Sequence, residues 1–276
     1  MMWEGHESAV LVAAHRGERF TAPENTMTAF RRAAALGVDM IETDVRMTAD
    51  GELVIMHDAT VDRTTDGTGA VREMSFAQFR SLNAACDYED FAPEAPPTLE
   101  EFLKFCASQD GMLIDFELKE YPVDDNEARA WECADRTIAM LEDYGFGDRC
   151  VLNSFNGALL EYIDEKYDHR YRLHGYYPYD ILKGARRDPR TYLYCLCLIS
   201  EKAGPNGTRK HFNFNVPPKA YFEAVRAAGI EPWVCAGIYS RAEIERCAQL
   251  GATLITTDYP ADILAHLRSM GYHDST

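Results

Sequence analysis

The regular alternation of short apolar runs with helical segments constrains the fold of this chain more than any other feature. Eight runs have the length and composition of β-strands, and most precede a segment with the end signals of a helix. The runs span residues 9–15, 40–45, 111–119, 150–155, 171–177, 211–216, 232–237 and 253–258. Eight alternating strand and helix units in roughly 250 residues predict a (β/α)8 (TIM) barrel. A doubly wound open sheet is the alternative, although no G-x-G-x-x-G or Walker-type loop follows a run.

The alternation is interrupted after the second run, between about residues 58 and 110. This stretch contains the turn sequence TTDGTG and two short helical segments. Ser75 and Thr98 are each followed three residues later by Gln or Glu, which is the capping-box pattern of a helix start. The sequence therefore predicts a single barrel domain over 1–276 with a small insertion at about 58–110. Apolar residues in 178–210 fit either an extra strand or a buried helix.

Composition and charge narrow the class of protein. The chain has 276 residues, of which 46% are hydrophobic, so a large core is available. Its net charge of −17 argues against nucleic acid and anionic membranes as partners. None of the eight cysteines forms a C-x-x-C pair, and most lie in apolar runs, which favours reduced thiols over a zinc ribbon. Without a transmembrane-length apolar run or a signal-peptide pattern, we expect a soluble, cytoplasmic protein with no stable membrane association.

Polar side chains gather at the carboxyl ends of the predicted strands. They are His15, Arg16, Glu42, Asp44, Glu117, Lys119 and Asp258, with His57 at the end of a further short strand-like run after the second strand. In a (β/α)8 barrel these strand ends form one rim, where active sites are built. The sequence therefore predicts that these residues converge on one mouth of the barrel.

Three of these residues are carboxylates that would repel one another. Glu42 and Asp44 are two positions apart on one strand, so both point to the same face, and Glu117 lies on the next strand of the barrel. Such a set either shares protons or holds a cation, and oxygen ligands favour Mg²⁺ or Ca²⁺. A zinc site completed by His15 and His57 is the alternative.

Two basic residues on the same rim, Arg16 and Lys119, indicate an anionic substrate, most naturally a phosphate. Together with the two histidines and a cation site, they are the components of metal-assisted phosphoester cleavage. Three further residues also have simple structural interpretations. Trp233 fits a core position better than a ligand contact, Asp258 fits a cap for the following helix, and Asp58 fits a residue that orients its neighbour or a turn.

The sequence blocks that carry these residues resemble those of a known family. They are AHRG (14–17), PENT (23–26), IETDVRMTADGELVIMHD (41–58), DRTTDGTG (62–69), PTLEEFL (97–103), FELK (116–119), NSF (153–155) and ITTDYP (255–260). In content and order they are similar to the signature blocks of the glycerophosphodiester phosphodiesterase family, within the phospholipase C-like TIM-barrel phosphodiesterases. The segment WVCAG departs from the more usual WTVN.

The resemblance implies a phosphoric diester hydrolase that converts glycerophosphodiesters, such as glycerophosphocholine or glycerophosphoethanolamine, into glycerol phosphate and an alcohol. It implies that His15 and His57 are the general acid and base and that three carboxylates hold one divalent cation. It further implies phosphate contacts from Arg16 and Lys119. Phe155 and Trp233 are expected as possible substrate contacts.

Three alternatives to this hydrolase remain. A glycoside hydrolase would use paired carboxylates but gives no reason for the histidines and basic residues. A phospholipid-directed phosphodiesterase of the same superfamily would need an exposed apolar or basic face. A catalytically silent binding barrel would not need every chemical position to be filled. The sequence leaves open the leaving alcohol, Mg²⁺ or Ca²⁺, the acid and base assignment, water or the glycerol 2-hydroxyl as nucleophile, and the oligomeric state.

Overall fold

Eight parallel strands form a closed barrel in the computed structural model, which describes residues 3, 9–203, 210–213, 216–235 and 240–274. The strands are β1 (Leu11–His15), β2 (Met40–Met47), β4 (Leu113–Leu118), β5 (Cys150–Asn153), β6 (Arg172–Tyr177), β7 (Cys195–Leu198), β10 (Glu231–Val234) and β11 (Leu254–Thr257). Each strand pairs in parallel with the next in this order, and β11 pairs with β1 to close the ring. The predicted (β/α)8 barrel is confirmed.

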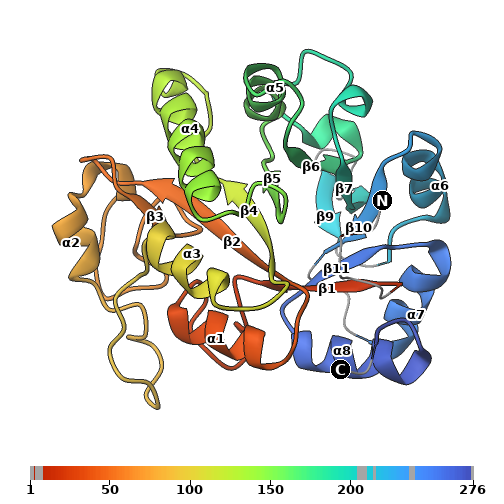
Figure 1. The fold of residues 1–276 in the computed structure, drawn as a ribbon, viewed down its shortest axis with the longest axis horizontal. Helices are drawn as coiled ribbons and strands as arrows, with labels where there is room; N and C mark the ends of the chain where they lie inside the picture. Colours follow the sequence, from red (N-terminus) through yellow and green to blue (C-terminus); the bar gives the residue numbers. More distant parts are fainter. Residues whose placement is uncertain (1–2, 4–8, 204–209, 214–215, 236–239, 275–276) are drawn as a thin grey trace.

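The helices lie around the outside of the strands (Figure 1). They are α1 (Met27–Ala35), α3 (Leu99–Ala107), α4 (Glu127–Asp143), α5 (Gly157–Lys166), α6 (Lys219–Ala227), α7 (Arg241–Leu250) and α8 (Pro260–Met270). Helix starts follow the sequence signals closely, since Thr98 and Ser240 both form complete capping boxes and the Thr26 hydroxyl caps α1. None of the described helices combines the length and apolar character needed to cross a membrane.

The segment of residues 48–98, between β2 and α3, is called the excursion after β2. It lies to one side of the barrel, next to α3 (Figure 1). It contains β3 (Leu53–Ile55), which pairs antiparallel with β2, and α2 (Phe76–Arg80), whose capping box at Ser75 is as predicted. The helix α3, which the sequence places inside the interruption, belongs to the barrel. Its Phe102 is fully buried between Phe30 of α1 and Phe116 of β4, with ring centroids 4.6 and 5.8 Å away.

The sixth barrel strand is not where the sequence places it. The run 211–216 was the candidate, but residues 210–213 form β9 (Lys210–Asn213), which pairs with β8 (Ser200–Ala203) in a separate antiparallel hairpin. The barrel position is taken by β7, from the apolar run that fits a strand or a buried helix equally well. Because β7 is short, is preceded by two 3₁₀ helices and is followed by β8 rather than by an α-helix, the alternation of strands and helices gives no signal there. Residues 214–215 of that candidate, and residues 236–237 of the next one, lie outside the described residues.

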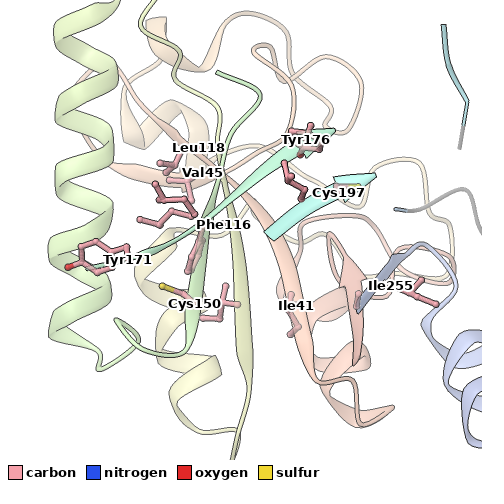
Figure 2. Close-up of a cluster of buried hydrophobic side chains, with 14 of the residues drawn as sticks. Ile41, Val45, Phe116, Leu118, Cys150, Tyr171, Tyr176, Cys197 and Ile255 are labelled. Carbon is pink, nitrogen blue, oxygen red and sulfur yellow. The ribbon is translucent and has the colours of Figure 1, made fainter. Parts of the chain in front are cut away.

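Strand alternation divides the core into two layers. Ile114, Phe116 and Leu118 of β4 face outward, where they meet the helices together with Val45 of β2 (Figure 2). Leu113 faces the barrel axis and packs in an inner cluster with Met40, Trp233 and their neighbours. The side chains that follow on this inner face of β4 are Asp115 and Glu117, so the interior of the barrel changes from apolar to charged toward its carboxyl-terminal end.

We expect Phe102→Ala to lower the free energy of unfolding by about 3–5 kcal/mol, because it leaves a cavity between α1, α3 and β4. Urea unfolding followed by circular dichroism measures the loss. Phe20→Ala is the control, since Phe20 is 64% exposed, and it should change the free energy of unfolding by less than about 0.5 kcal/mol. Similar losses in the two variants would contradict the proposed packing.

Candidate active site

A pocket of about 400 Å³ opens at the carboxyl-terminal end of the barrel strands. It is lined by residues from seven barrel strands and their loops, and the sequence-predicted residues among them are His15, Arg16, Glu42, His57, Glu117, Phe155 and Asp258. Asp44 and Lys119 are buried beside it and contact the lining residues. The structure thus brings the predicted site residues together, with the exception of Trp233.

The loop after β1 adopts a backbone that only certain residues tolerate. Arg16 has φ +56°, and Gly17 has φ +79°. A Cβ atom on residue 17 would lie 2.8 Å from the carbonyl carbon of Ala29, so glycine is required there. This turn directs the Arg16 amide toward β2, where it donates a hydrogen bond to Glu42 Oε2 at 2.9 Å. The HRG sequence therefore fixes the position of one carboxylate of the site.

Glu42, Asp44 and Glu117 form a buried cluster in which one oxygen of each lies within 4.8 Å of the others. At that separation two unit charges repel by about 3.5 kcal/mol if the effective dielectric constant is about 20. Burial and the neighbouring Asp44 raise the pKa of Glu42 well above its usual value. Burial would also raise the pKa of Asp44, but Lys119 and Arg16 outweigh it, so this pKa is lowered. Asp44 is therefore the carboxylate most firmly ionised.

Two cations and one amide surround Asp44. Lys119 Nζ lies 3.1 Å from Asp44 Oδ1 and 2.5 Å from Glu117 Oε1, and Arg16 Nε lies 3.4 Å from Asp44 Oδ2. Asn25, at φ +55°, donates from Nδ2 to Asp44 Oδ2 at 2.8 Å. These contacts set three carboxyl groups against two cations, so full ionisation of the cluster would leave one negative charge to be balanced.

The donor set fits a hard divalent cation. Asp44 Oδ1 is buried and accepts no hydrogen bond among the described residues, and its ion pair with Lys119 at 3.1 Å leaves it able to act as a ligand as well. The potential ligands are all carboxylate oxygens, the type that Mg²⁺ and Ca²⁺ prefer. Among the described residues, neither histidine belongs to this group, and His15 Nε2 is 3.9 Å from Glu42 Oε2. The geometry therefore favours an oxygen-ligated ion over the zinc alternative.

Each of the two histidines is held by an aspartate through Nδ1. His15 Nδ1 lies 2.6 Å from Asp258 Oδ1, and His57 Nδ1 lies 2.6 Å from Asp58 Oδ1. With Nδ1 engaged, Nε2 is the nitrogen left to exchange protons. Burial lowers the pKa of His57 to about 4, so this ring is neutral at pH 7. The cap interpretation of Asp258 is wrong, because no side chain caps α8, whereas the orienting role of Asp58 agrees with the structure.

Sequence reasoning missed a residue, Arg46, that holds two segments of the site in place. Arg46 of β2 donates from Nε and Nη2 to the carbonyl oxygen of His57, and from Nη1 to that of Lys119 at 3.3 Å. It thereby holds two segments that carry site residues. Its signal was available, because Arg46 continues the two-residue spacing of Glu42 and Asp44 along one strand.

A second missed feature is Glu24, which binds three arginines. Its carboxylate contacts Arg16 at 2.9 Å, Arg19 at 2.7 Å and Arg63 at 2.6 Å. Arg63 comes from the excursion after β2 and also lies 2.5 Å from Asp58 Oδ2. Glu24 therefore links the loop after β1 to the aspartate that holds His57. Arg63 lies 39 residues from Glu24 in the sequence, so no local pattern predicts that contact.

The two expected substrate contacts differ in their placement. Phe155 lines the pocket and stacks on Tyr176, with ring centroids 3.6 Å apart. Trp233 is 2% exposed, packs in the inner core and meets the His174 ring edge to face at 4.8 Å. The pocket lining does not include Trp233, so its position favours the core interpretation.

A (β/α)8 barrel with buried carboxylates, two histidines and basic residues at its mouth defines a class of hydrolytic barrel enzymes. The chain matches the model of the glycerophosphoryl diester phosphodiesterase family over residues 15–262. It therefore belongs to that family, and it is an enzyme of that class, as the sequence blocks predict.

Individual relatives agree with this assignment. The chain is 31% identical to a glycerophosphodiester phosphodiesterase of Caldanaerobacter subterraneus over 268 residues, which cover 95% of this chain and 99% of the relative. A solved structure from Silicibacter pomeroyi superposes with a TM-score of 0.78 at 25% identity and covers 97% of this chain and 96% of its own. An Oleispira antarctica phosphodiesterase, solved with its product sn-glycerol 3-phosphate, has the same fold at 23% identity. Its TM-score is 0.74, with 93% of this chain and 96% of its own covered.

Mg²⁺ or Ca²⁺ should stabilise the protein, because the ion relieves repulsion among buried carboxylates. At one hundred times the dissociation constant, the gain is about 2.7 kcal/mol, or roughly 5–10 °C in Tm for a chain of this size. Thermal unfolding with and without a chelator measures it. Glu42→Gln should lose most of this shift and be more stable than wild type when chelated.

Glu132→Gln is the matched control, because Glu132 lies on an exposed face of α4. It should keep the full shift in Tm. The same shift in Glu42→Gln as in wild type would rule out this cluster as the cation site.

Proposed function

We propose that this protein hydrolyses glycerophosphodiesters, such as glycerophosphocholine and glycerophosphoethanolamine, to glycerol 3-phosphate and an alcohol. The observation that carries the proposal is the juxtaposition, at one barrel mouth, of two histidines with a carboxylate cluster and two cations. Membership of the family supports the same reaction. The residues 1–276 would act as a single catalytic domain, with the stretch at about 58–110 as an insertion that supplies part of the site.

Glu42, Asp44 and Glu117 would hold one divalent ion, Mg²⁺ or Ca²⁺. When bound, the ion would supply positive charge near the non-bridging oxygens of the phosphodiester. Arg16 lines the pocket and would contact the same phosphate directly. Lys119 is buried against Asp44 and Glu117, so its charge would act through the carboxylate cluster. Both residues would stabilise the charge that develops on the phosphate during the reaction.

The two histidines would carry the proton transfers. One imidazole would take a proton from the attacking oxygen, and the other would give a proton to the oxygen of the leaving alcohol. Asp258 and Asp58 would keep each ring in the orientation and tautomer in which Nε2 faces the substrate. Two His–Asp pairs in one pocket would thus supply both a base and an acid for displacement at phosphorus.

We expect His15→Ala and His57→Ala each to lower kcat by at least about 10²-fold, the usual scale of acid–base catalysis. Steady-state kinetics on glycerophosphocholine measures the loss, with the Tm of each variant as a check on folding. His169→Ala is the matched control, since His169 pairs with Asp164 outside the pocket. Near-wild-type turnover in either pocket variant would reject the two-histidine mechanism.

Alternative functions predict different requirements. A glycoside hydrolase needs no cation, and a phospholipid-directed enzyme needs a lipid-binding face. The described residues expose few large hydrophobic side chains, namely Phe20, Tyr88 and Val123. A small, water-borne substrate in the cytoplasm fits this surface better than a bilayer lipid. A silent binding barrel would leave the histidines without a role.

A panel of glycerophosphodiesters tests the function as a whole. We expect release of glycerol 3-phosphate, detected by a coupled dehydrogenase assay, that depends on added Mg²⁺ or Ca²⁺ and stops with a chelator. Sphingomyelin and a p-nitrophenyl glycoside serve as substrates for the alternatives. If no glycerophosphodiester is cleaved, the proposed function fails.

A further inference from the structure

The inner end of the pocket contains three buried polar atoms that have no hydrogen-bond partner among the described residues. They are Asp115 Oδ1, Asn153 Oδ1 and His174 Nε2. Their side chains are 0%, 2% and 3% exposed, and all three residues line the pocket. Among the described residues, the hydrogen bonds of the carboxylate cluster, His15 and His57 do not involve these three atoms.

Strand register explains why these atoms lie together. Asn153 of β5 is paired with Glu117 of β4 on one side and with His174 of β6 on the other. Asp115 precedes Glu117 by two residues, so it shares the inward face one layer deeper. Three neighbouring strands therefore each place one polar side chain on the same inner wall, next to a proposed metal ligand.

The wall is held in place by contacts on its other sides. His174 Nδ1 lies 2.9 Å from Asp115 Oδ2, and the His174 ring packs edge to face on Trp233 beneath it at 4.8 Å. Because Nδ1 contacts the carboxylate, Nε2 is the ring nitrogen left to accept a hydrogen bond from the pocket. These contacts fix the direction of the unpartnered atoms, so the wall is preorganised.

Branched apolar side chains normally fill the interior layers of a (β/α)8 barrel. Buried acceptors without donors destabilise the folded state, so their presence calls for a partner that supplies hydrogen-bond donors. All three unpartnered atoms are acceptors. Hydroxyl groups meet this need, and so would the primary ammonium group of ethanolamine, whereas a phosphate oxygen or a quaternary ammonium group has no hydrogen to donate.

We infer that this inner wall is the subsite for the polyol part of the substrate, with Asn153, His174 and Asp115 accepting hydrogen bonds from its hydroxyl groups. The inference rests on the proposed function and orients the substrate: the glycerol points into the barrel and the other alcohol points toward the rim. Phe155 and Ile199, which line the same pocket, supply apolar surface for the carbon chain. The subsite recognises a small polyhydroxylated group and excludes choline from the inner end.

The test compares two ligands that differ only in their hydroxyl groups, sn-glycerol 3-phosphate and n-propyl phosphate. Titration calorimetry on the Mg²⁺-loaded wild-type protein should give a dissociation constant at least about 10-fold lower for sn-glycerol 3-phosphate, because buried acceptors are left unpaired by the propyl chain. Equal dissociation constants would overturn the inference and show that water alone fills the inner end. This comparison needs no variant.

Asn153→Leu removes one acceptor and keeps the side-chain volume. The ratio of the two dissociation constants should fall to within about 3-fold of one, whereas a preserved ratio would reject the role of Asn153. Thr253→Val is the matched control, because Thr253 Oγ1 is also buried and unpartnered but lies outside the pocket lining. It should keep the wild-type ratio. Hydrolysis of glycerophosphocholine by the same wild-type sample is measured in parallel. Equal dissociation constants in an active enzyme would reject the polyol subsite alone, whereas an inactive enzyme would reject the proposed function.

Discussion

Repulsion among three buried carboxylates is the constraint on which the rest of the site depends. Glu42, Asp44 and Glu117 lie on neighbouring strands that also close the barrel, so they cannot move apart without breaking strand pairing. The chain offsets the repulsion with Lys119 and Arg16, both of which are themselves buried. Each of these cations would be unstable in the interior without its partners. The cluster and its counter-charges are therefore one unit, and the loop after β1 adopts a left-handed backbone in order to complete it.

A chain of ion pairs extends this unit to the excursion after β2. Glu24 binds Arg16 inside the site and Arg63 in the excursion, and Arg63 binds Asp58, which holds His57. The three arginines lower the pKa of Glu24 to about 2 in spite of its burial, so it stays ionised throughout the neutral range. The excursion is thus part of the site as well as an addition to the barrel. It carries one histidine of the site and is attached to the other side of the mouth through charges that are partly shielded from water.

The sequence predicted those parts of the structure that leave a local signal. Strand alternation placed Glu42, Asp44 and Glu117 on one face, and capping boxes marked the starts of α2 and α3. It failed where the information is non-local. The short strand β7 has the same apolar composition as a buried helix, and only its pairing with β6 and β10 defines it. Asp258 resembles a helix cap until the closed barrel brings β11 beside β1, where it meets His15.

The side chains inside the barrel change from apolar to polar at one level along the barrel axis. Below it, Met40, Leu113 and Trp233 fill the axis as an apolar core, and above it every inward position on β4 is charged. His174 lies at the boundary, with an aromatic contact to Trp233 on one side and an unpartnered nitrogen on the other. Moving this boundary upward by one layer would replace Asp115 and His174 with apolar residues and would remove buried polar atoms that cost stability. That the chain keeps them implies a donor that arrives from the pocket. The level at which the apolar core ends therefore sets how deeply a substrate can enter and which of its ends enters first.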